Sequence, residues 1–502
     1  MKEWPPLLDY FKNELGYEVT AEVSSLGYEL FYINLSSLKL RLSNRTPVVR
    51  VKNADLAGMT PHQLLQSIQD VIREKKWGNQ TTMILLEGKS EPLLKYTTGP
   101  LYSNLVVIGV EEQERVRQSR RPTGDFMDII STQIPISLLS PYETTSPVTG
   151  SRFFGRELEI SRILGNPDTN HLVLGIRRIG KTSLLREIER ILRDKENAPH
   201  VVYMDCSDLI STDDYVREVV RRLEPRELPR LEMQKYVFYF PNFLERMQLR
   251  HKSRLIFILD EIDNLIIFQR GDWELFRMLR ASSNKGACQY IIAGFREAQR
   301  EQYLLDSPMF NFAQSIRLNE FTMQQARDLI ITPMENLGIR LKNKDEVVTR
   351  IYQETAGHPN LIQYYCMILL RRLDQTGERE ITPDSLIDNI YKDEGFRGHL
   401  LSSFMENTHN REKAVVYAIL LGKQGTSRLG IVSQAFMDAS LRKKGITLKQ
   451  TDLDEACNML ILAGILHRKE KDYSFTSPVF VKMLQQSYDL NHLFSKTKEE
   501  GL

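Results

Sequence analysis

One short segment constrains the fold more than any other part of the sequence. The apolar run Leu172–Leu174 leads directly into residues 175–182, GIRRIGKT, which match the pattern G-x-x-x-x-G-K-[ST]. After the loop, apolar residues recur at helical spacing, at Leu184, Leu185, Ile188, Ile191 and Leu192. A strand, a glycine-flanked loop and a helix in this order predict a phosphate-binding loop at the end of a parallel strand.

The residue types of the loop suit this chemistry. Gly175 and Gly180 carry no side chain that would obstruct the approach of a phosphate to backbone N–H groups. Lys181 is predicted to neutralise the β- and γ-phosphate oxygens, and the Thr182 hydroxyl to hold Mg²⁺. The predicted nucleotide-binding residues of this segment are Gly175, Ile176, Arg177, Arg178, Ile179, Gly180, Lys181, Thr182 and Ser183.

A second run, Leu255–Leu259, ends in the adjacent acids Asp260 and Glu261. At the exit of a buried strand, Asp260 is predicted to bind the metal, and Glu261 to orient or deprotonate the attacking water. The pair therefore favours hydrolysis over binding alone. A nucleotide-binding scaffold without turnover is the alternative that Glu261 disfavours.

Short apolar runs alternate with helical patterns from His171 onward, which is typical of a parallel sheet covered by helices. Residues 323–404 read as purely helical, and residues 411–475 as three helices followed by a β-rich segment. The expected strands of the sheet are His171–Gly175, Val201–Asp205, Leu255–Asp260, Gln289–Gly294 and Ser315–Leu318.

Further motifs around the loop resemble those of STAND NTPases, a branch of the AAA+-like P-loop ATPases related to origin-recognition ATPases. Phe153-Phe154-Gly155-Arg156-Glu157 resembles the family's box beside the adenine, where the Arg and Glu secure the nucleotide. Gly294-Phe295-Arg296 resembles the sensor whose Arg reaches the γ-phosphate, so Arg296 joins Glu261 and Lys181 as a catalytic candidate. Gly357-His358-Pro359 resembles the G-x-P motif of the helical lid.

The resemblance implies an AAA+-like parallel sheet with a helical lid, binding ATP or ADP with Mg²⁺, and a C-terminal winged helix. It adds Phe154, Gly155, Arg156, Glu157, His358 and Pro359 to the nucleotide-binding candidates. The expected organisation is an α/β domain at 1–115, a linker at 116–150, the ATPase core at 151–320, the lid at 321–405, the winged helix at 406–490 and a tail at 491–502.

The N-terminal region reads as a small α/β domain, with strands at Tyr28–Leu35, Lys39–Leu42, Val48–Val51, Thr82–Leu86 and Leu105–Val110 and a helix at Pro61–Lys75. A nuclease would need an acid two residues before Lys52, where Arg50 stands, so a sensor, adaptor or assembly role is favoured. The prolines and glycines of 116–150 predict a connector that is not packed.

The predicted winged helix has helices around Ala414–Ile419, Ile431–Phe436 and Asp452–Leu462 and a wing at Ile465–Phe475. Its third helix opens with acids that would face DNA phosphates, so a protein-contacting or autoinhibitory role is favoured over DNA binding. The wing's Arg468, Lys469 and Lys471 keep nonspecific phosphate contacts open.

The composition points to a soluble, cytoplasmic protein. The net charge is +2, four cysteines are scattered singly, and the apolar runs are far too short to cross a membrane. We therefore predict an ATP-driven molecular switch that self-associates and engages at least one protein partner. A place in a prokaryotic conflict or antiviral defence system is an analogy, and a DNA-engaging initiator, helicase loader or transposition regulator is the alternative.

Overall fold

The computed structural model describes residues 4–23, 25–42, 44–56, 58–78, 80–97, 102–231, 236–423 and 430–501. The chain divides into two compact units. Unit 1 comprises the chain up to Tyr142 together with Arg327–Arg350 and Gln363–Ile387. Unit 2 comprises Glu143–Ala326, Ile351–Ile362 and the chain from Asp388 onward.

Unit 1 is built on a mixed sheet. Its strand order is β1 (Val19–Ala21), β2 (Glu29–Ile33), β3 (Thr46–Val51), β4 (Thr82–Leu86) and β5 (Leu105–Ile108). The first three strands are antiparallel, and β3, β4 and β5 are parallel. The helices of this part are α1 (Pro6–Asn13), α2 (Asn53–Leu56), α3 (Pro61–Glu74), α4 (Glu91–Thr97), α5 (Val110–Gln118), α6 (Pro122–Gln133) and α7 (Ile136–Leu139).

Helix α3 forms where its sequence pattern predicts it. Thr60 accepts a hydrogen bond from the Gln63 backbone N–H in a capping box, and Pro61 opens the first turn. The five apolar side chains of one α3 face are buried against the strands of the sheet. This face supplies much of the apolar area that stabilises the N-terminal part of unit 1.

Two predictions for this region are wrong. Lys39–Leu42 forms no strand: Ser36–Leu38 is a 3₁₀ turn, and Lys39 ends it in the left-handed conformation with φ 52°. Residues 116–150 are not an unpacked connector, because α6 and α7 lie within them and bury Phe126, Ile129 and Ile130. Pro122 stands in the first turn of α6, where a missing N–H costs nothing, so proline marked a helix start here and not a break.

The lid predicted at 321–405 is divided between the units. The boundary passes through α16 (Met323–Asn336), α17 (Lys344–Thr355) and α18 (Pro359–Thr376). The segment is also not purely helical, because β11 (Arg340–Leu341) pairs with β12 (Glu380–Ile381). Within unit 1, the Asp374 carboxylate accepts the backbone N–H groups of Ile136 and Ser137 and so caps α7.

Unit 2 holds a parallel sheet with the strand order β10-β6-β9-β8-β7. The strands are β6 (His171–Leu174), β7 (His200–Asp205), β8 (Leu255–Asp260), β9 (Cys288–Gly294) and β10 (Gln314–Arg317). The central strands β6, β8 and β9 are buried throughout, as their continuous apolar runs predict. Strand β9 lies between the loop strand β6 and the acidic strand β8.

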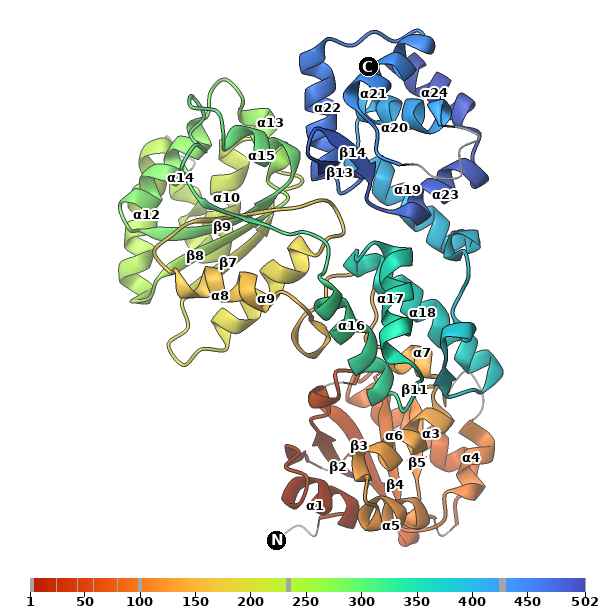
Figure 1. Cartoon of the computed structure of the whole chain (residues 1–502). Helices are drawn as coiled ribbons and strands as arrows, with labels where there is room; N and C mark the ends of the chain where they lie inside the picture. Colours follow the sequence, from red (N-terminus) through yellow and green to blue (C-terminus); the bar gives the residue numbers. More distant parts are fainter. Residues whose placement is uncertain are drawn as a thin grey trace. The chain divides into compact units, whose positions relative to one another are not determined.

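Helices cover both faces of this sheet (Figure 1). One face packs on α10 (Thr212–Leu223), α12 (Tyr236–His251), α13 (Asp263–Gln269) and α14 (Glu274–Asn284). Helix α9 (Lys181–Arg193) packs against β7, β8 and β9 from the other face. The shorter elements of this part are α8 (Glu157–Gly165), α11 (Leu228–Leu231) and α15 (Arg296–Glu301).

The C-terminal region of unit 2, residues 388–501, begins with α19 (Glu394–Asn407). The helices α20 (Asn410–Gly422), α21 (Gln434–Lys443) and α22 (Gln450–Leu462) lead into the hairpin β13 (Leu466–Lys469)–β14 (Asp472–Phe475), and α23 (Pro478–Ser487) and α24 (Leu490–Glu499) follow. Val432 pairs with Tyr473 of the hairpin, so Ile431–Ser433 lies outside the helix predicted there. Ser433 instead caps α21 by accepting the Phe436 N–H.

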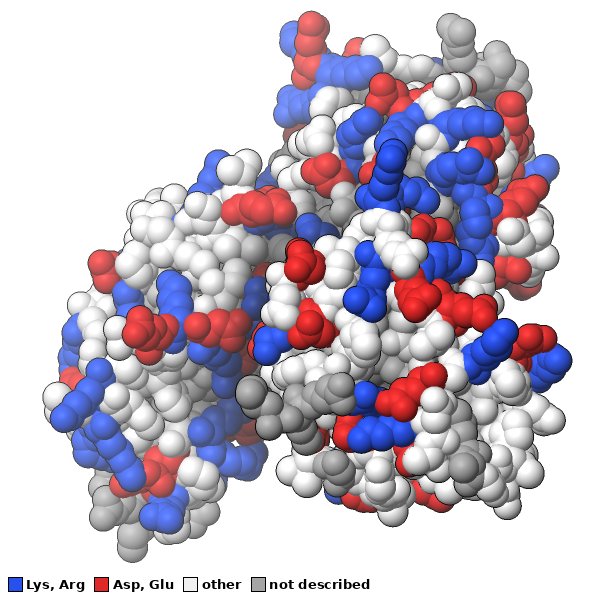
Figure 2. Space-filling view, turned by 90° about the horizontal axis from the view of Figure 1, so that it is seen from below, with Lys and Arg blue, Asp and Glu red and all other residues white. Residues whose placement is uncertain are grey.

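Surface charge is mixed, in keeping with the net charge of +2. Figure 2 shows basic and acidic side chains interspersed on the face that it presents. Within the described residues, no helix combines the length and the apolar character that a membrane span needs.

Candidate nucleotide site

The loop after β6 has the backbone of a phosphate cradle. Gly180 has φ 104°, and Arg178 is also left-handed with φ 67°. A Cβ atom added to Gly175 would lie 2.8 Å from Cγ2 of Ile179, so only glycine fits at that position. The loop therefore curls tightly before α9 begins at Lys181, and the N–H groups of the first turn of α9 are left for a ligand.

The side chains at the start of α9 fit a triphosphate. Lys181 is buried, and its Nζ donates to the carbonyl oxygens of Gly175 (3.0 Å) and Ile176 (3.2 Å), so the ammonium lies inside the loop. Thr182 follows at the second position of the helix. Ser183 has a structural partner, because its Oγ accepts the Val148 N–H at 3.1 Å.

The two predicted acids, Asp260 and Glu261, lie at the end of β8. Asp260 is only 2% exposed; its Oδ2 accepts the Tyr203 hydroxyl at 2.8 Å, and its Oδ1 accepts the Glu261 backbone N–H at 3.0 Å. Glu261 has a left-handed backbone, with φ 51°. Burial raises the pKa of Glu261 above its ordinary value, while the Lys181 ammonium opposes that rise. Such a carboxylate is a stronger base than an exposed one.

The predicted sensor arginine follows β9. A Cβ atom on Gly294 would lie 2.6 Å from Cβ of Ala298, which explains glycine there. The Asp263 carboxylate accepts the N–H groups of Phe295, Glu297 and Ala298 and so fixes the start of α15. Arg296 itself donates to both oxygens of Glu412 in α20, at 3.1 and 2.6 Å. Its predicted contact with a γ-phosphate stays a prediction.

The box at residues 153–157 packs around the same loop. Phe154 is buried, and Gly155 is left-handed, with φ 72°; a Cβ atom there would lie 3.1 Å from the Phe321 ring and 3.2 Å from Cβ of Gln325. Arg156 is 4% exposed and donates to the carbonyl oxygens of Asn319 (2.6 Å) and Ile179 (3.4 Å). Glu157 is exposed and accepts the Gly155 N–H at 3.2 Å. Arg156 therefore links the phosphate loop, at Ile179, to the segment that follows β10, at Asn319.

The G-x-P motif lies at the start of α18. Gly357 has φ 72°, and a Cβ atom there would lie 2.8 Å from the Phe321 carbonyl oxygen. His358 is buried with neither ring nitrogen bonded, and burial lowers its pKa to about 3, so the ring is neutral. Pro359 opens the helix. His358 lines a mostly apolar cavity of about 70 Å³ that also borders Ile176, Glu320, Leu361, Phe404 and Phe480.

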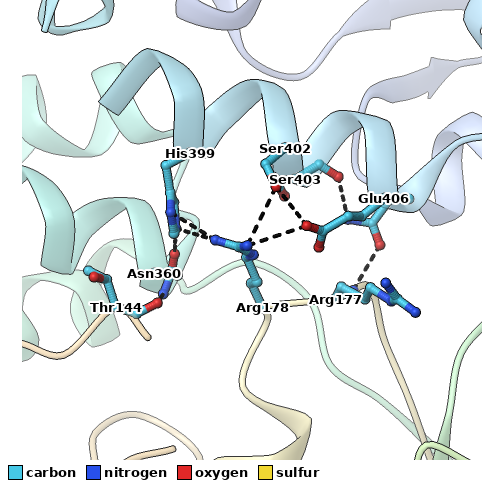
Figure 3. Close-up of polar contacts among 9 residues, drawn as sticks. Thr144, Arg177, Arg178, Asn360, His399, Ser402, Ser403 and Glu406 are labelled. Carbon is cyan, nitrogen blue, oxygen red and sulfur yellow. Dashed lines mark hydrogen bonds and ion pairs between the residues drawn. The ribbon is translucent and has the colours of Figure 1, made fainter. Parts of the chain in front are cut away.

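The C-terminal region contacts the phosphate loop directly (Figure 3). Arg178 donates to Nδ1 of His399 (2.8 Å), to Ser402 (3.5 Å) and to Glu406 (3.3 Å), all on α19. The Arg177 backbone N–H donates to Oδ1 of Asn407 at 2.8 Å. His399 in turn bonds Asn360 at the start of α18. Helix α19 therefore forms hydrogen bonds with both arginines of the loop and, through His399, with Asn360 of the lid.

Comparison with known proteins agrees with this geometry. Residues 153–365 match a family model described as an ATPase domain predominantly from Archaea. Residues 153–365 are a P-loop ATPase domain. No curated protein matches the sequence.

Solved structures of low sequence identity also match the chain. A Walker-type ATPase of Pyrococcus abyssi has a TM-score of 0.50 at 16% identity, over 69% of this chain and 99% of that one. The ORC2 protein of Aeropyrum pernix, solved as ADPNP–ADP complexes, has a TM-score of 0.49 at 12% identity, over 72% and 98%. The Thermotoga maritima RuvB Holliday junction branch migration motor has a TM-score of 0.38 at 15% identity, over 69% and 99%. The predicted α/β fold and the ATPase assignment are confirmed; the STAND assignment stays a prediction.

The donor set of the ATPase domain fits magnesium. The Thr182 hydroxyl and the Asp260 carboxylate are hard oxygen ligands of the kind that Mg²⁺ prefers. Among the residues that the structure describes, no Lys or Arg forms an ion pair with Asp260. These two residues would hold the ion, which would neutralise charge on the phosphates when bound.

Several residues that contact the predicted site residues could not be recognised from the sequence. Tyr203, His399 and Glu412 contact predicted residues from positions far along the chain, and Asp263 accepts the N–H of Phe295 beside Arg296. Asp263 opens α13 two residues after Glu261, and its place in the sequence does not indicate that its carboxylate caps α15. The other contacts depend on tertiary packing.

Proposed function

We propose that the protein is an ATP-hydrolysing switch of STAND type, in which the C-terminal region responds to the nucleotide held by the ATPase domain. The bidentate pair of Arg296 and Glu412 carries this proposal. It joins a predicted γ-phosphate sensor to α20, and both partners are largely buried, at 13% and 6% side-chain exposure.

In this proposal, different residues of the site bind the phosphates, activate the water and hold the adenine. The loop backbone and Lys181 would bind the phosphates, with Lys181 exchanging its two carbonyl contacts for phosphate oxygens. Glu261 would accept the proton of the attacking water, a role that its raised pKa favours. The mostly apolar cavity at His358, bordered by loop, lid and C-terminal residues, supports a place there for the adenine of the nucleotide.

The proposed switch depends on competition between Glu412 and the γ-phosphate for the guanidinium of Arg296. Arg296 uses two N–H groups on the two oxygens of Glu412, and a γ-phosphate that took them would leave Glu412 buried without its cation. Because an unpaired buried carboxylate is costly, α20 would then loosen from the ATPase domain. ADP has no γ-phosphate and would leave the pair intact.

The test is the substitution Glu412→Gln, with ATP and ADP affinities measured by calorimetry. Loss of the competing charge should tighten ATP binding about 5- to 50-fold and leave ADP binding within twofold, in the range of ordinary coupling energies. Asp438→Asn, which removes a half-buried C-terminal carboxylate that forms an ion pair with Arg442, is the matched control. An unchanged ratio of ATP to ADP affinity in Glu412→Gln would exclude the switch.

DNA engagement is a second candidate, and one observation favours it. The acids that argued against it have partners inside the protein: Asp452 and Glu455 lie 3.5 and 3.6 Å from Arg411, and Asp454 accepts the side-chain amides of Gln434 and Gln450. The exposed charges near α22 and the hairpin are then mainly basic, at Lys443, Lys449, Arg468, Lys469 and Lys471. A C-terminal winged helix of this kind would contact phosphates with its wing.

Fluorescence anisotropy with a labelled duplex tests this candidate across a salt series. Wild-type affinity should fall steeply with salt, and the double substitution Lys469→Glu, Lys471→Glu should lower the salt slope by about 2. Lys496→Glu on α24, which removes a lysine paired with Glu500, is the control. Binding that is independent of salt and of the wing lysines would remove DNA as a partner. Self-association and a protein partner stay predictions.

A further inference from the structure

The carboxylate of Asp260 is held by neutral donors on both of its oxygens. Tyr203 donates its hydroxyl to Oδ2 at 2.8 Å, and the Glu261 backbone N–H donates to Oδ1 at 3.0 Å. A carboxylate can otherwise rotate about its Cβ–Cγ bond. Donors on separate oxygens fix its plane and leave the remaining lone pairs in a set direction.

Tyr203 reaches Asp260 from the neighbouring strand. It belongs to β7, the edge strand of the sheet, and β7 pairs in parallel with β8, so that Tyr203 lies opposite Ile258. Its side chain extends toward the carboxyl end of the sheet, where Asp260 lies. The hydroxyl is thus presented by regular structure and not by a loop, which gives it a precise position.

The ring of Tyr203 is itself held in place. The guanidinium carbon of Arg186 lies 3.3 Å from the ring centroid, and Arg186 also pairs with Glu189 at 3.0 Å. Arg186 belongs to α9, five residues after Lys181. The chain of contacts therefore runs from the phosphate-loop helix through the edge strand to the acidic strand.

We propose that Tyr203 is a positioning residue for the divalent-cation site, orienting the Asp260 carboxylate through its hydroxyl, with Arg186 holding the ring. This inference rests on the proposed function, because it takes Asp260 as a metal ligand. Partners that orient a ligating carboxylate without touching the metal commonly contribute 10- to 100-fold to metal affinity. Tyr203 is the side-chain donor that the structure shows on Asp260.

The test is Tyr203→Phe, which keeps the ring beneath Arg186 and removes only the hydroxyl. Mn²⁺ affinity in the presence of ADP, measured by electron paramagnetic resonance, should weaken about 10- to 100-fold. ADP affinity in EDTA should stay within twofold, since the hydroxyl contacts no part of the phosphate loop. Arg186→Met should weaken Mn²⁺ binding less, by about 2- to 10-fold.

Tyr290→Phe is the matched control. Tyr290 is a fully buried tyrosine of β9 whose hydroxyl bonds Ser282 at 2.9 Å, so the substitution removes a buried hydroxyl of the same sheet away from the acids. Its Mn²⁺ affinity should equal that of the wild type. A purely structural role of Tyr203 would lower the unfolding temperature and leave Mn²⁺ affinity unchanged, and that result would overturn the inference.

The outcomes separate this inference from the proposed function. If the wild-type protein binds neither ADP nor Mn²⁺·ADP, the proposed function fails and this inference with it. If the wild type binds both and Tyr203→Phe binds Mn²⁺ equally well, only the positioning role fails. Should Tyr203→Phe not fold, Arg186→Met decides, and unchanged Mn²⁺ affinity in that variant counts against the inference.

Discussion

The sheets of the two units both gather charged residues at the carboxyl ends of parallel strands, but they treat the charges differently. In unit 1, Arg50 pairs with Glu29 (3.1 Å) and Glu87 (2.9 Å), and Lys52 pairs with Glu29 (2.7 Å). Every carboxylate of that cluster has a cation within the protein. In unit 2, the donors to Asp260 within the described part of the chain are a hydroxyl and a backbone N–H.

The pKa directions express the same contrast. Hydrogen bonding from Lys52 lowers the pKa of Glu29, whereas burial raises the pKa of Glu261. A cluster whose carboxylates are paired with cations of the protein stabilises its own sheet. A cluster whose carboxylates lack such partners is suited to binding an external cation. In unit 1, the Arg50 guanidinium lies between the carboxylates of Glu29 and Glu87.

The sharpest way to break this comparison is to neutralise one glutamate in each sheet. Glu261→Gln should slow ATP hydrolysis about 10²- to 10⁴-fold, the contribution expected of a general base, while ATP stays bound. Glu29→Gln should leave the rate within twofold. Phosphate release measures the rate and filter binding the retained ATP. Full turnover in Glu261→Gln would remove Glu261 from the chemistry.

A smaller effect is expected from opening the compensated cluster. Arg50→Ala would leave Glu29 and Glu87 without their shared cation, and loss of charged hydrogen bonds at this partly buried position should destabilise unit 1 by about 1–3 kcal/mol. Hydrogen exchange of the β3 and β4 amides localises the change. Arg73→Ala, which breaks an exposed pair with Asp70, is the control and should shift stability by less than about 0.5 kcal/mol.

ATP hydrolysis should be insensitive to Arg50→Ala. Equal destabilisation by Arg50→Ala and Arg73→Ala would mean that the cluster in unit 1 is no more than ordinary surface charge. The difference between the two sheets would then lie in unit 2 alone.

The parts of the molecule that depend on local pattern could be predicted from the sequence. The strand, loop and helix around Lys181 and the acids at the end of β8 lie where the apolar runs place them. The errors came where one signal has two meanings. Proline is common both in connectors and in the first turn of a helix, so Pro122 alone did not distinguish the two. The helix forms because the apolar side chains of α6 pack in unit 1.

The partners of the site residues could not be predicted in the same way. Tyr203 and Asp260 are 57 residues apart, and Arg296 and Glu412 are 116 apart. No spacing rule operates over such separations, since these contacts arise from strand order and from the packing of α20. The Glu412 pair therefore came to light only in the structure, although Arg296 itself was predicted.

The smallest expected effect concerns stability against pH, and its sign differs between the sheets. Since the pKa of Glu261 is raised in the folded protein, its ionised form opposes folding, and Glu261→Gln should raise the unfolding temperature at pH 7–8. That gain should shrink as the pH falls through the raised pKa and vanish below the ordinary value of 4.5.

Glu29 should behave in the opposite way, because its folded pKa is lowered. Its ionised form contributes stability above the ordinary pKa of 4.5, so Glu29→Gln should lower the unfolding temperature at neutral pH, and the loss should fade as the pH falls through the lowered pKa. Thermal unfolding of both variants from pH 3 to pH 8 measures the two trends. Shifts of the same sign at pH 7 would contradict the comparison, because a buried uncompensated base and an ion-paired carboxylate must respond to neutralisation in opposite directions.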